Sequence, residues 1–337
     1  MKIRENVNIS ELTTMRLGGP ARYVIEVETK TDVVDAFTFA EEKNLPTFIL
    51  GGGANTLGHD EGYDGVIILN KIRSLSDKIL DENSILITAG GGEEWDDVVA
   101  FATEKDYTGI EALSKIPGSA GAAPVQNIGA YGQDISRTFV SAEVYDRVER
   151  TFKTLKKDDL NFSYRKSILN TTEKNHYFVV SITLKLSKGV MSRPFYNSIE
   201  KYIADNNETD FGPKNIRKIV SEIRSDKLPD PKDKASSGSF FKNVYLTEDE
   251  AKLAEEKGIR VYRGKDGVKI NSGFLIEKAG LKGQLIDGMR VSDKAALVLI
   301  NESAKSYEDL ATARKKIIET VKNDSGFTLE QEPVELV

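Results

Sequence analysis

The sequence of 337 residues contains no cysteine and only two histidines, His59 and His176. The missing thiols exclude disulfides, thiolate metal sites, iron–sulfur clusters and cysteine nucleophiles. Two imidazoles are too few for a histidine-rich metal site, so we predict no bound metal. Any redox chemistry must then come from a bound organic cofactor.

Long hydrophobic runs and an excess of positive charge are also missing. No apolar stretch reaches the roughly 18 residues of a membrane span, and the N-terminus, Met-Lys-Ile-Arg-Glu-Asn-Val, lacks the apolar region of a signal peptide. The formal net charge of -6 does not favour a nucleic-acid partner. With 39% hydrophobic residues, the chain can bury a large core in two or three domains. We expect a soluble cytoplasmic protein that neither inserts into a membrane nor binds nucleic acid.

The segment 116–132, Ile-Pro-Gly-Ser-Ala-Gly-Ala-Ala-Pro-Val-Gln-Asn-Ile-Gly-Ala-Tyr-Gly, is the most informative part of the chain. Its many small residues leave little side chain to fill a core, and glycine allows backbone to approach closely. Successive backbone N–H groups in tight turns form concavities that suit phosphate or the polar edge of a ring system. The adjacent amides of Gln126 and Asn127 indicate placed hydrogen-bonding groups. We interpret the segment as a cofactor cradle; the alternative is a surface loop without a ligand.

A second glycine cluster follows a predicted α/β unit. A strand is expected over 21–28, then a helix capped by Thr29 or Thr31, then a short strand over 47–50. Gly51-Gly-Gly-Ala-Asn55 comes at the carboxyl end of that strand, where open α/β sheets bind ligands. It is not a GxGxxG fingerprint and no helix is expected after it, so a Rossmann fold is not supported. A structural turn and a pyrophosphate site explain it equally well.

Hydrophobic patterns predict the remaining elements. Strands are expected over 66–69, 85–88, 140–145, 152–155 and 177–186, and helices over 94–105, around 216–223 and after the capping box Ser306-x-x-Asp309. The helix around 216–223 breaks at Leu228-Pro-Asp-Pro, which predicts a domain boundary.

Five motifs in one order carry a resemblance to a known family. They are Gly51-Gly-Gly-Ala-Asn55, Ile116-Pro-Gly118 with Gln126-Asn-Ile-Gly-Ala-Tyr-Gly132, Tyr164-Arg-Lys-Ser167, Gly238-Ser-Phe-Phe-Lys-Asn243 and Leu329-Glu-Gln-Glu332. The chain resembles the type I UDP-N-acetylenolpyruvoylglucosamine reductases (UDP-N-acetylmuramate dehydrogenases) over nearly its whole length. The resemblance implies an α+β fold: a two-domain FAD-binding module of the vanillyl-alcohol-oxidase (PCMH) type and a third, substrate-binding α+β domain. The implied boundaries are 1–70, 71–227 with 326–337 returning to it, and 228–325.

The resemblance also implies a flavin oxidoreductase of peptidoglycan precursor synthesis. FAD would be bound noncovalently, NADPH would donate hydride, and the substrate would be UDP-N-acetylglucosamine enolpyruvate; we expect a monomer. A cysteinyl flavin link is impossible, and His59 is the only nearby histidine. The implied FAD-binding residues are Gly51, Gly52, Gly53, Ala54, Asn55, Pro117, Gly118, Ser119, Gly121, Ala122, Gln126, Asn127, Gly129, Ala130 and Tyr131.

Three residues match the catalytic positions of the family. Reducing an enolpyruvyl ether needs a cation for the substrate carboxylate and an acid for the carbon next to the one that receives hydride. Arg165 would supply the cation, Ser239 would protonate the enolate, and Glu332 would help to stabilise or relay charge. Each has an ordinary alternative: a surface salt bridge for Arg165, a turn serine for Ser239, and a solvated acidic tail for Glu332. Glu330 and Glu335 compete with Glu332.

Substrate contacts are implied for Lys227, Asn243 and Tyr196. The lysine and the asparagine would bind the UDP diphosphate or sugar, and the tyrosine would clamp the nucleotide unless it only packs its ring on the core. The chain departs from the family pattern at Ala122-Ala123, where some relatives have serines, and at Lys294, where a histidine is common. Two other functions stay open: a different flavoprotein oxidase or dehydrogenase, and a noncatalytic nucleotide-sugar binding protein.

Overall fold

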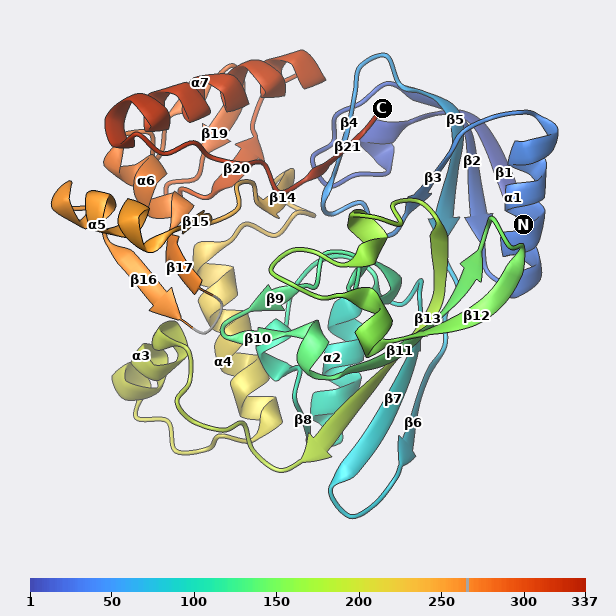
Figure 1. Cartoon of the computed structure of the whole chain (residues 1–337), viewed down its shortest axis with the longest axis horizontal. Coiled ribbons are helices and arrows are strands. Elements are labelled where there is room, and N and C mark those ends of the chain that lie inside the picture. The colour runs from blue at the N-terminus through green and yellow to red at the C-terminus, as the bar shows by residue number, and fades with distance from the viewer. Residues whose placement is uncertain (265–266) are drawn as a thin grey trace. The chain divides into compact units, whose positions relative to one another are not determined.

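The computed structural model describes residues 1–264 and 267–337, which form two compact units (Figure 1). The first unit contains Met1–Val7, Ala21–Gly52 and Asp64–Ser225. The second contains Asn8–Pro20, Gly53–Tyr63 and Asp226–Val337. The three domains expected from the sequence, with residues 326–337 returning to 71–227, stay a prediction.

The first unit begins with a sheet in the order β1-β2-β5-β3 and the helix α1. The bounds are β1 (Lys2–Asn8), β2 (Pro20–Val27), α1 (Lys30–Glu42), β3 (Thr47–Leu50) and β5 (Tyr63–Asn70). Thr29 caps α1 by accepting a hydrogen bond from the backbone N–H of Asp32, whose side chain accepts from Thr29 N–H in return. Val33, Ala36 and Phe37 of α1 pack on the strands. The strands predicted over 21–28, 47–50 and 66–69 and the Thr29 cap are confirmed.

A larger sheet in the order β12-β11-β13-β7-β6, with β8 also paired to β13, and a separate two-stranded sheet of β9 and β10 form the rest of this unit's β-structure. The bounds are β6 (Leu75–Ile79), β7 (Ser84–Gly90), α2 (Trp95–Glu104), β8 (Tyr107–Thr108), β9 (Gly129–Ala130), β10 (Gln133–Asp134), β11 (Phe139–Asp146), β12 (Thr151–Lys156) and β13 (Tyr177–Lys188). Trp95, Val98 and Val99 of α2 share a core with β7, β11 and β13. The alternation predicted for β13 is confirmed, since Val180, Ile182, Leu184 and Leu186 are all buried.

Two helices complete the first unit. They are α3 (Asn197–Asn206) and α4 (Pro213–Lys227), and they share a core that includes Phe195, Ile199 and Ile219. The helix predicted around 216–223 is α4, and it ends directly before Leu228-Pro as expected. The helix α3 was not predicted, because only Ile199 and Ile203 of its ten residues are buried.

The second unit contains short strands and three helices. A sheet has the order β14-β20-β19-β18, a smaller one has the order β15-β17-β16, and β21 pairs in parallel with β4. The bounds are β4 (Thr56–Gly58), β14 (Ser236–Ser239), β15 (Val244–Leu246), α5 (Glu248–Glu256), β16 (Val261–Gly264), β17 (Gly267–Ile270), α6 (Ser272–Lys278), β18 (Leu285–Ile286), β19 (Met289–Val291), β20 (Val298–Asn301), α7 (Tyr307–Ser325) and β21 (Val334–Leu336). The capping box predicted at Ser306 is confirmed at the start of α7.

Several short 3-10 helices connect these elements. Their bounds are Ile9–Glu11, Glu111–Leu113, Ala120–Ala122, Ile135–Arg137, Lys157–Leu160 and Ile168–Asn170. Within the described residues, no helix combines the length and the apolar character that a membrane span requires.

Candidate active site

The two glycine-rich segments of the sequence meet in the first unit. A methyl group added to Gly52 would lie 2.9 Å from the Cα of Gly118, and one added to Gly51 would collide with the hydroxyl of Ser119. Backbones can approach this closely only where both sides lack bulky side chains. The glycines therefore join the loop after β3 to the small-residue segment 116–132.

A third glycine run, Gly90-Gly-Gly92, belongs to the same arrangement. A methyl group on Gly121 would lie 2.9 Å from the Cα of Gly91, and Gly121 N–H donates to the Gly91 carbonyl at 2.9 Å. Trp95 N–H donates to Gly118 O at 2.9 Å, so the start of α2 is bound to the cradle as well. This run was not predicted as part of a site, although its three glycines follow the strand predicted over 85–88 closely, as those at 51–53 follow the strand predicted over 47–50.

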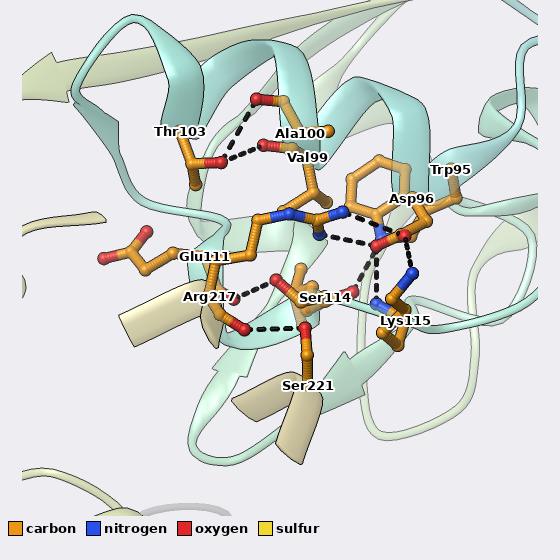
Figure 2. A network of polar contacts seen from close by, with 11 residues as sticks. Trp95, Asp96, Val99, Ala100, Thr103, Glu111, Ser114, Lys115, Arg217 and Ser221 are labelled. Atoms are coloured by element: carbon orange, nitrogen blue, oxygen red, sulfur yellow. Dashed lines mark hydrogen bonds and ion pairs between the residues drawn. The ribbon is translucent and has the colours of Figure 1, made fainter. Parts of the chain in front are cut away.

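An ion pair fixes the chain that enters the cradle. Figure 2 shows the carboxylate of Asp96, in the first turn of α2, between Arg217 of α4 and Lys115. The Arg217 guanidinium bonds both carboxylate oxygens at 2.6 and 2.9 Å, and the backbone N–H of Lys115 donates at 2.7 Å. Burial acts to raise the pKa of Asp96, but the bonds from Arg217 and Lys115 outweigh it and lower the pKa to about 2. Asp96 is therefore ionised at neutral pH and ties residue 115 to two helices.

The Tyr164-Arg-Lys-Ser167 motif is held against the other end of the cradle. Asn127 Nδ2 donates to Ser163 O at 3.1 Å, Ser167 Oγ donates to Val125 O at 2.8 Å, and Arg165 Nη2 donates to Gly129 O at 3.3 Å. Two motifs that are more than thirty residues apart in the sequence thus form one surface. The Asn127 amide, predicted as a cofactor contact, serves here to bond protein backbone: its oxygen accepts from Ser136 N–H at 3.1 Å.

Arg165 occupies a tight turn with an unusual backbone conformation. Ser163 and Lys166 exchange hydrogen bonds of 3.0 and 3.1 Å, and Arg165, between them, has a φ of 56°. Residues other than glycine, asparagine and aspartate rarely adopt this region, and such strain concentrates at functional sites. The turn presents a half-buried guanidinium next to Gly129. Its bond to a cradle carbonyl differs from the surface salt bridge that was the ordinary alternative.

Tyr196 lies beside the last residues of the cradle. Its ring meets that of Tyr131 edge to face, with centroids 5.8 Å apart, while 52% of Tyr196 is exposed. Both interpretations of Tyr196, a nucleotide clamp and a ring packed on the core, stay predictions. Tyr131 also bonds to Arg224 of α4, and burial raises the pKa of Tyr131 and lowers that of Arg224. An exposed ring over Tyr131 can move without disrupting the fold.

Gly53, Ala54 and Asn55 belong to the second unit. Gly53 has a φ of 65°, and a methyl group there would collide with the carbonyl of Leu12. Asn55 O accepts from Val334 N–H at 2.9 Å, which joins this loop to the C-terminal strand. The loop after β3 thus also anchors the end of the chain.

A β-bulge sets the position of Ser239 at the end of β14. Ser236 pairs with Ile300 and Ser239 with Val298, so β14 has one residue more than β20 between the two pairs. Gly238, inside this bulge, has a φ of 69° and open space where a Cβ would be, so the backbone conformation and not crowding requires glycine. Bulges re-aim side chains, and this one turns Ser239 out of the regular alternation of the strand.

Glu332 lies beside the residue that follows Ser239. Phe241 and Gln331 form an antiparallel bridge, with Glu332 N–H donating to Phe240 O at 2.9 Å and Lys242 N–H donating to Glu330 O at 2.8 Å. The two competing glutamates have structural partners: Glu330 forms an ion pair with Lys242, and Glu335 bonds to Tyr307 and Arg314. The structure thus brings the Gly-Ser-Phe-Phe-Lys-Asn and Leu-Glu-Gln-Glu motifs together within the second unit.

The remaining predicted residues lie elsewhere in the second unit. Asn243 Oδ1 accepts from the N–H of Ser272 at 3.3 Å, at the start of α6. Lys227 is exposed at the end of α4. Lys294 is 3.7 Å from Asp226, the residue before Lys227.

The cradle has the properties that a bound flavin requires. Its close backbone contacts depend on the absence of side chains, and Ser119 Oγ is buried without a hydrogen-bond partner among the described residues. A buried, unpaired hydroxyl is costly unless a ligand or water satisfies it. Ala122 and Ala123 add no polar side chain here, which leaves Ser119 as the hydroxyl in this stretch.

Comparisons with known proteins identify the class. Residues 21–154 match the FAD binding domain family, and residues 230–336 match the family described as "UDP-N-acetylenolpyruvoylglucosamine reductase, C-terminal domain". The chain is an FAD-binding oxidoreductase, with an FAD-binding domain and a further α+β domain.

Full-length relatives identify the family. The chain is 35% identical to the UDP-N-acetylenolpyruvoylglucosamine reductase of Ralstonia nicotianae, covering 95% of each chain, and 34% identical to that of Thermobifida fusca, covering 98% and 96%. The crystal structure of the enzyme from Thermus caldophilus has the same fold, with a TM-score of 0.68, 22% identity and full coverage of both chains. The chain belongs to the UDP-N-acetylenolpyruvoylglucosamine reductase family, a family of flavoproteins in peptidoglycan synthesis.

Proposed function

We propose that the protein uses NADPH and FAD to reduce UDP-N-acetylglucosamine enolpyruvate to UDP-N-acetylmuramate. The bridge between residues 240–242 and 330–332, which joins two of the family motifs, carries this proposal. It supports a joint role for Ser239 and Glu332, because it fixes their segments side by side. The family membership supports the reaction class.

The proposed FAD site is the cradle. FAD, when bound, accepts hydride from NADPH and passes it to one carbon of the enolpyruvyl double bond. The glycines at 51–53, 118 and 121 let backbone approach it, and the Ser119 hydroxyl offers a hydrogen bond. The residues proposed to hold FAD are Gly51, Gly52, Gly53, Ala54, Asn55, Pro117, Gly118, Ser119, Gly121, Ala122, Gln126, Asn127, Gly129, Ala130 and Tyr131.

The proposed reaction adds hydride to one carbon of the double bond and a proton to its neighbour. Arg165 binds the substrate carboxylate as negative charge moves onto it, because a guanidinium is always charged and can bond both oxygens. Ser239 Oγ gives its proton to the carbanionic carbon, and Glu332 helps to balance the charge at this position. The substrate gains two electrons and NADPH becomes NADP⁺.

Three further residues would bind the substrate without taking part in hydride or proton transfer. Lys227 and Asn243 are proposed to bind the diphosphate or the sugar, because an exposed ammonium is a compact partner for phosphate. Tyr196, exposed above Tyr131, is proposed to close over the nucleotide and exclude water.

We further propose that the enzyme acts as a monomer. Light scattering on the eluted protein tests this, and the mass of a dimer would contradict it.

Stopped-flow measurement of the two half-reactions of Ser239→Ala tests the proposal. The flavin of the purified variant should be reduced by NADPH at the wild-type rate, while its reoxidation by UDP-N-acetylglucosamine enolpyruvate should slow by about 10²–10⁴-fold, the usual contribution of a general acid. Ser236→Ala is the matched control, since the Ser236 hydroxyl bonds only the Lys234 carbonyl among the described contacts. An equal loss in both half-reactions would exclude an acid role for Ser239, and wild-type protein without flavin reoxidation by this substrate would exclude the reaction.

A further inference from the structure

The C-terminal segment that carries Glu332 has little backbone pairing of its own. Residues 330–332 form one isolated bridge with 240–242, and β21 pairs with β4 over only three residues. Pro333, between the two, has no N–H to donate. A segment with so few backbone hydrogen bonds opens easily unless side chains hold it. Glu332 therefore needs a further constraint to stay beside Phe240.

Side chains of α7 supply that constraint. Arg314 Nη1 donates to Gln331 Oε1 and to Glu335 Oε1, both at 2.5 Å. Tyr307 OH donates to the same Glu335 carboxylate at 2.6 Å. Gln331 Nε2 in turn donates to Pro333 O at 2.8 Å. The residues on both sides of Glu332 are thus bound to one helix through one guanidinium.

The loop after β4 adds a second set of contacts to α7. His59 stacks on the ring of Tyr307, with centroids 3.6 Å apart, and its Nε2 lies 3.3 Å from Glu335. Asp60 accepts from the backbone N–H of Tyr307 at 2.7 Å and of Glu308 at 3.2 Å. The strand that pairs with β21 and the helix that binds Glu335 are therefore fixed to each other.

The charges of this cluster are matched over a wide pH range. Burial acts to raise the pKa of Glu335, but the bonds from Tyr307 and Arg314 lower it to about 2. Burial and the bond to Glu335 raise the pKa of Tyr307 to about 12. At neutral pH one carboxylate faces one guanidinium, so the contact is charge-assisted and strong. Removing either partner leaves the other half-buried without its counter-charge.

We infer that Arg314 and Glu335 are positioning residues, which hold residues 331–335 on α7 and so keep Glu332 beside Phe240, the residue that follows Ser239. This inference rests on the proposed role of Glu332 in the reaction. Neither residue touches the reacting atoms; they act through the chain on either side of Glu332.

A double-mutant cycle between Arg314→Gln and Glu332→Gln tests the inference on the holoenzyme. Arg314→Gln should leave reduction of the flavin by NADPH within twofold of wild type and slow its reoxidation by UDP-N-acetylglucosamine enolpyruvate by about 10- to 100-fold, the usual result of a displaced catalytic group. In the Glu332→Gln background, Arg314→Gln should add less than a twofold loss. Glu335→Gln, which keeps the shape of the side chain, should repeat the result more weakly. Arg263→Gln is the control, since Arg263 forms a similar pair with Glu255 at an exposed position.

The outcomes separate this inference from the proposed function. If Glu332→Gln itself reoxidises at the wild-type rate, the role of Glu332 fails, and with it the inference. If Glu332→Gln is slow but Arg314→Gln and Glu335→Gln are not, the positioning role alone is wrong. Equal losses in both half-reactions, or losses that multiply fully with that of Glu332→Gln, would mean that Arg314 only stabilises the fold.

Discussion

The two groups of proposed site residues are held in place by different means. In the first unit, Gly51, Gly52 and Gly121 bring backbones together, and the cradle is defined by where side chains are absent. In the second unit, one bulge and one isolated bridge place Ser239 and Glu332, and the charged side chains of Arg314 and Glu335 hold the bridge.

This difference decides what each part tolerates. A backbone cradle is insensitive to charge but cannot accept an added methyl group, because two packed backbones have no room to move. The ion pair between Arg314 and Glu335 accepts small changes of side-chain volume but depends on both charges. Variants of the cradle glycines should therefore impair flavin binding, and with it both half-reactions. Variants of Arg314 or Glu335 should impair only the reoxidation of the flavin by substrate.

After Ser239→Ala, the largest effect is expected for Arg165→Lys, which keeps the positive charge next to Gly129 but removes the planar guanidinium. Substrate-dependent reoxidation of the flavin should fall by about 10²–10³-fold, as for the loss of one transition-state donor. Stopped-flow absorbance of the flavin measures it. Lys166→Arg, in the same turn but exposed, is the control. Near-normal reoxidation in Arg165→Lys would show that a point charge is enough at this position.

The next effect in size concerns the cradle itself. Gly52→Ala places a methyl group 2.9 Å from the Cα of Gly118, and overpacking of this kind costs about 1–3 kcal/mol. The purified variant should contain less flavin and bind added FAD more weakly, as measured by quenching of flavin fluorescence. Gly264→Ala, where an added methyl group would have no atom of the described residues within 4 Å, should keep its flavin. A Gly52→Ala protein with full flavin content would show that the two loops can separate without cost.

A smaller and pH-dependent effect is expected for Asp96→Asn. The lost bonds to Arg217 and Lys115 should reduce the free energy of unfolding by about 1.5–3 kcal/mol at pH 7. Because the pKa of Asp96 is about 2 in the folded protein and 3.8 ordinarily, the stabilisation is complete above about pH 4 and is lost as the pH falls toward 2.

Urea unfolding followed by the fluorescence of Trp95, the single tryptophan, measures this directly. The difference between wild type and Asp96→Asn should shrink between pH 5 and pH 3, and the exposed neighbour Asp97→Asn serves as control. A difference that is independent of pH would exclude the ionised carboxylate as its source.

The smallest effect compares the helix caps of the two units. Thr29→Ala should cost about 1–2 kcal/mol, because the capping box with Asp32 provides the described side-chain cap of α1. Ser306→Ala should cost only about 0.5–1 kcal/mol, because Asp60 still accepts from two N–H groups of α7. Thermal unfolding of both variants measures the two losses of stability. A larger loss for Ser306→Ala than for Thr29→Ala would contradict the prediction.

The sequence predicted the long, regular elements and the chemistry of the motifs. The helices α1, α2, α4 and α7 and the strand β13 follow from periodicity and capping residues. It predicted no element over 243–301, because strands of two to four residues, such as β18 and β19, are too short to show a period. It also missed α3 and the glycine run at 90–92.

Composition alone would leave Glu330, Glu332 and Glu335 as equivalent residues of an acidic tail, and only the family motif selects Glu332. The structure adds a partner for each competitor: Glu330 forms an ion pair with Lys242 and Glu335 bonds to Arg314, while the backbone N–H of Glu332 donates to Phe240 O. No local pattern could show the pairing of 330–332 with 240–242, because these segments are about ninety residues apart in the sequence.

By itself, then, the sequence determined which chemistry is available: no thiols, a glycine-rich cradle, a guanidinium, a serine and a glutamate in recurrent motifs. Composition, periodicity and turn residues act over a few positions and can be read directly from the chain. The tertiary structure alone decided which glycines meet, how the bulge at Gly238 orients Ser239, and which carboxylates serve the fold. These outcomes depend on register and packing between segments far apart in sequence, where many arrangements satisfy the local rules and only the packed one satisfies them together.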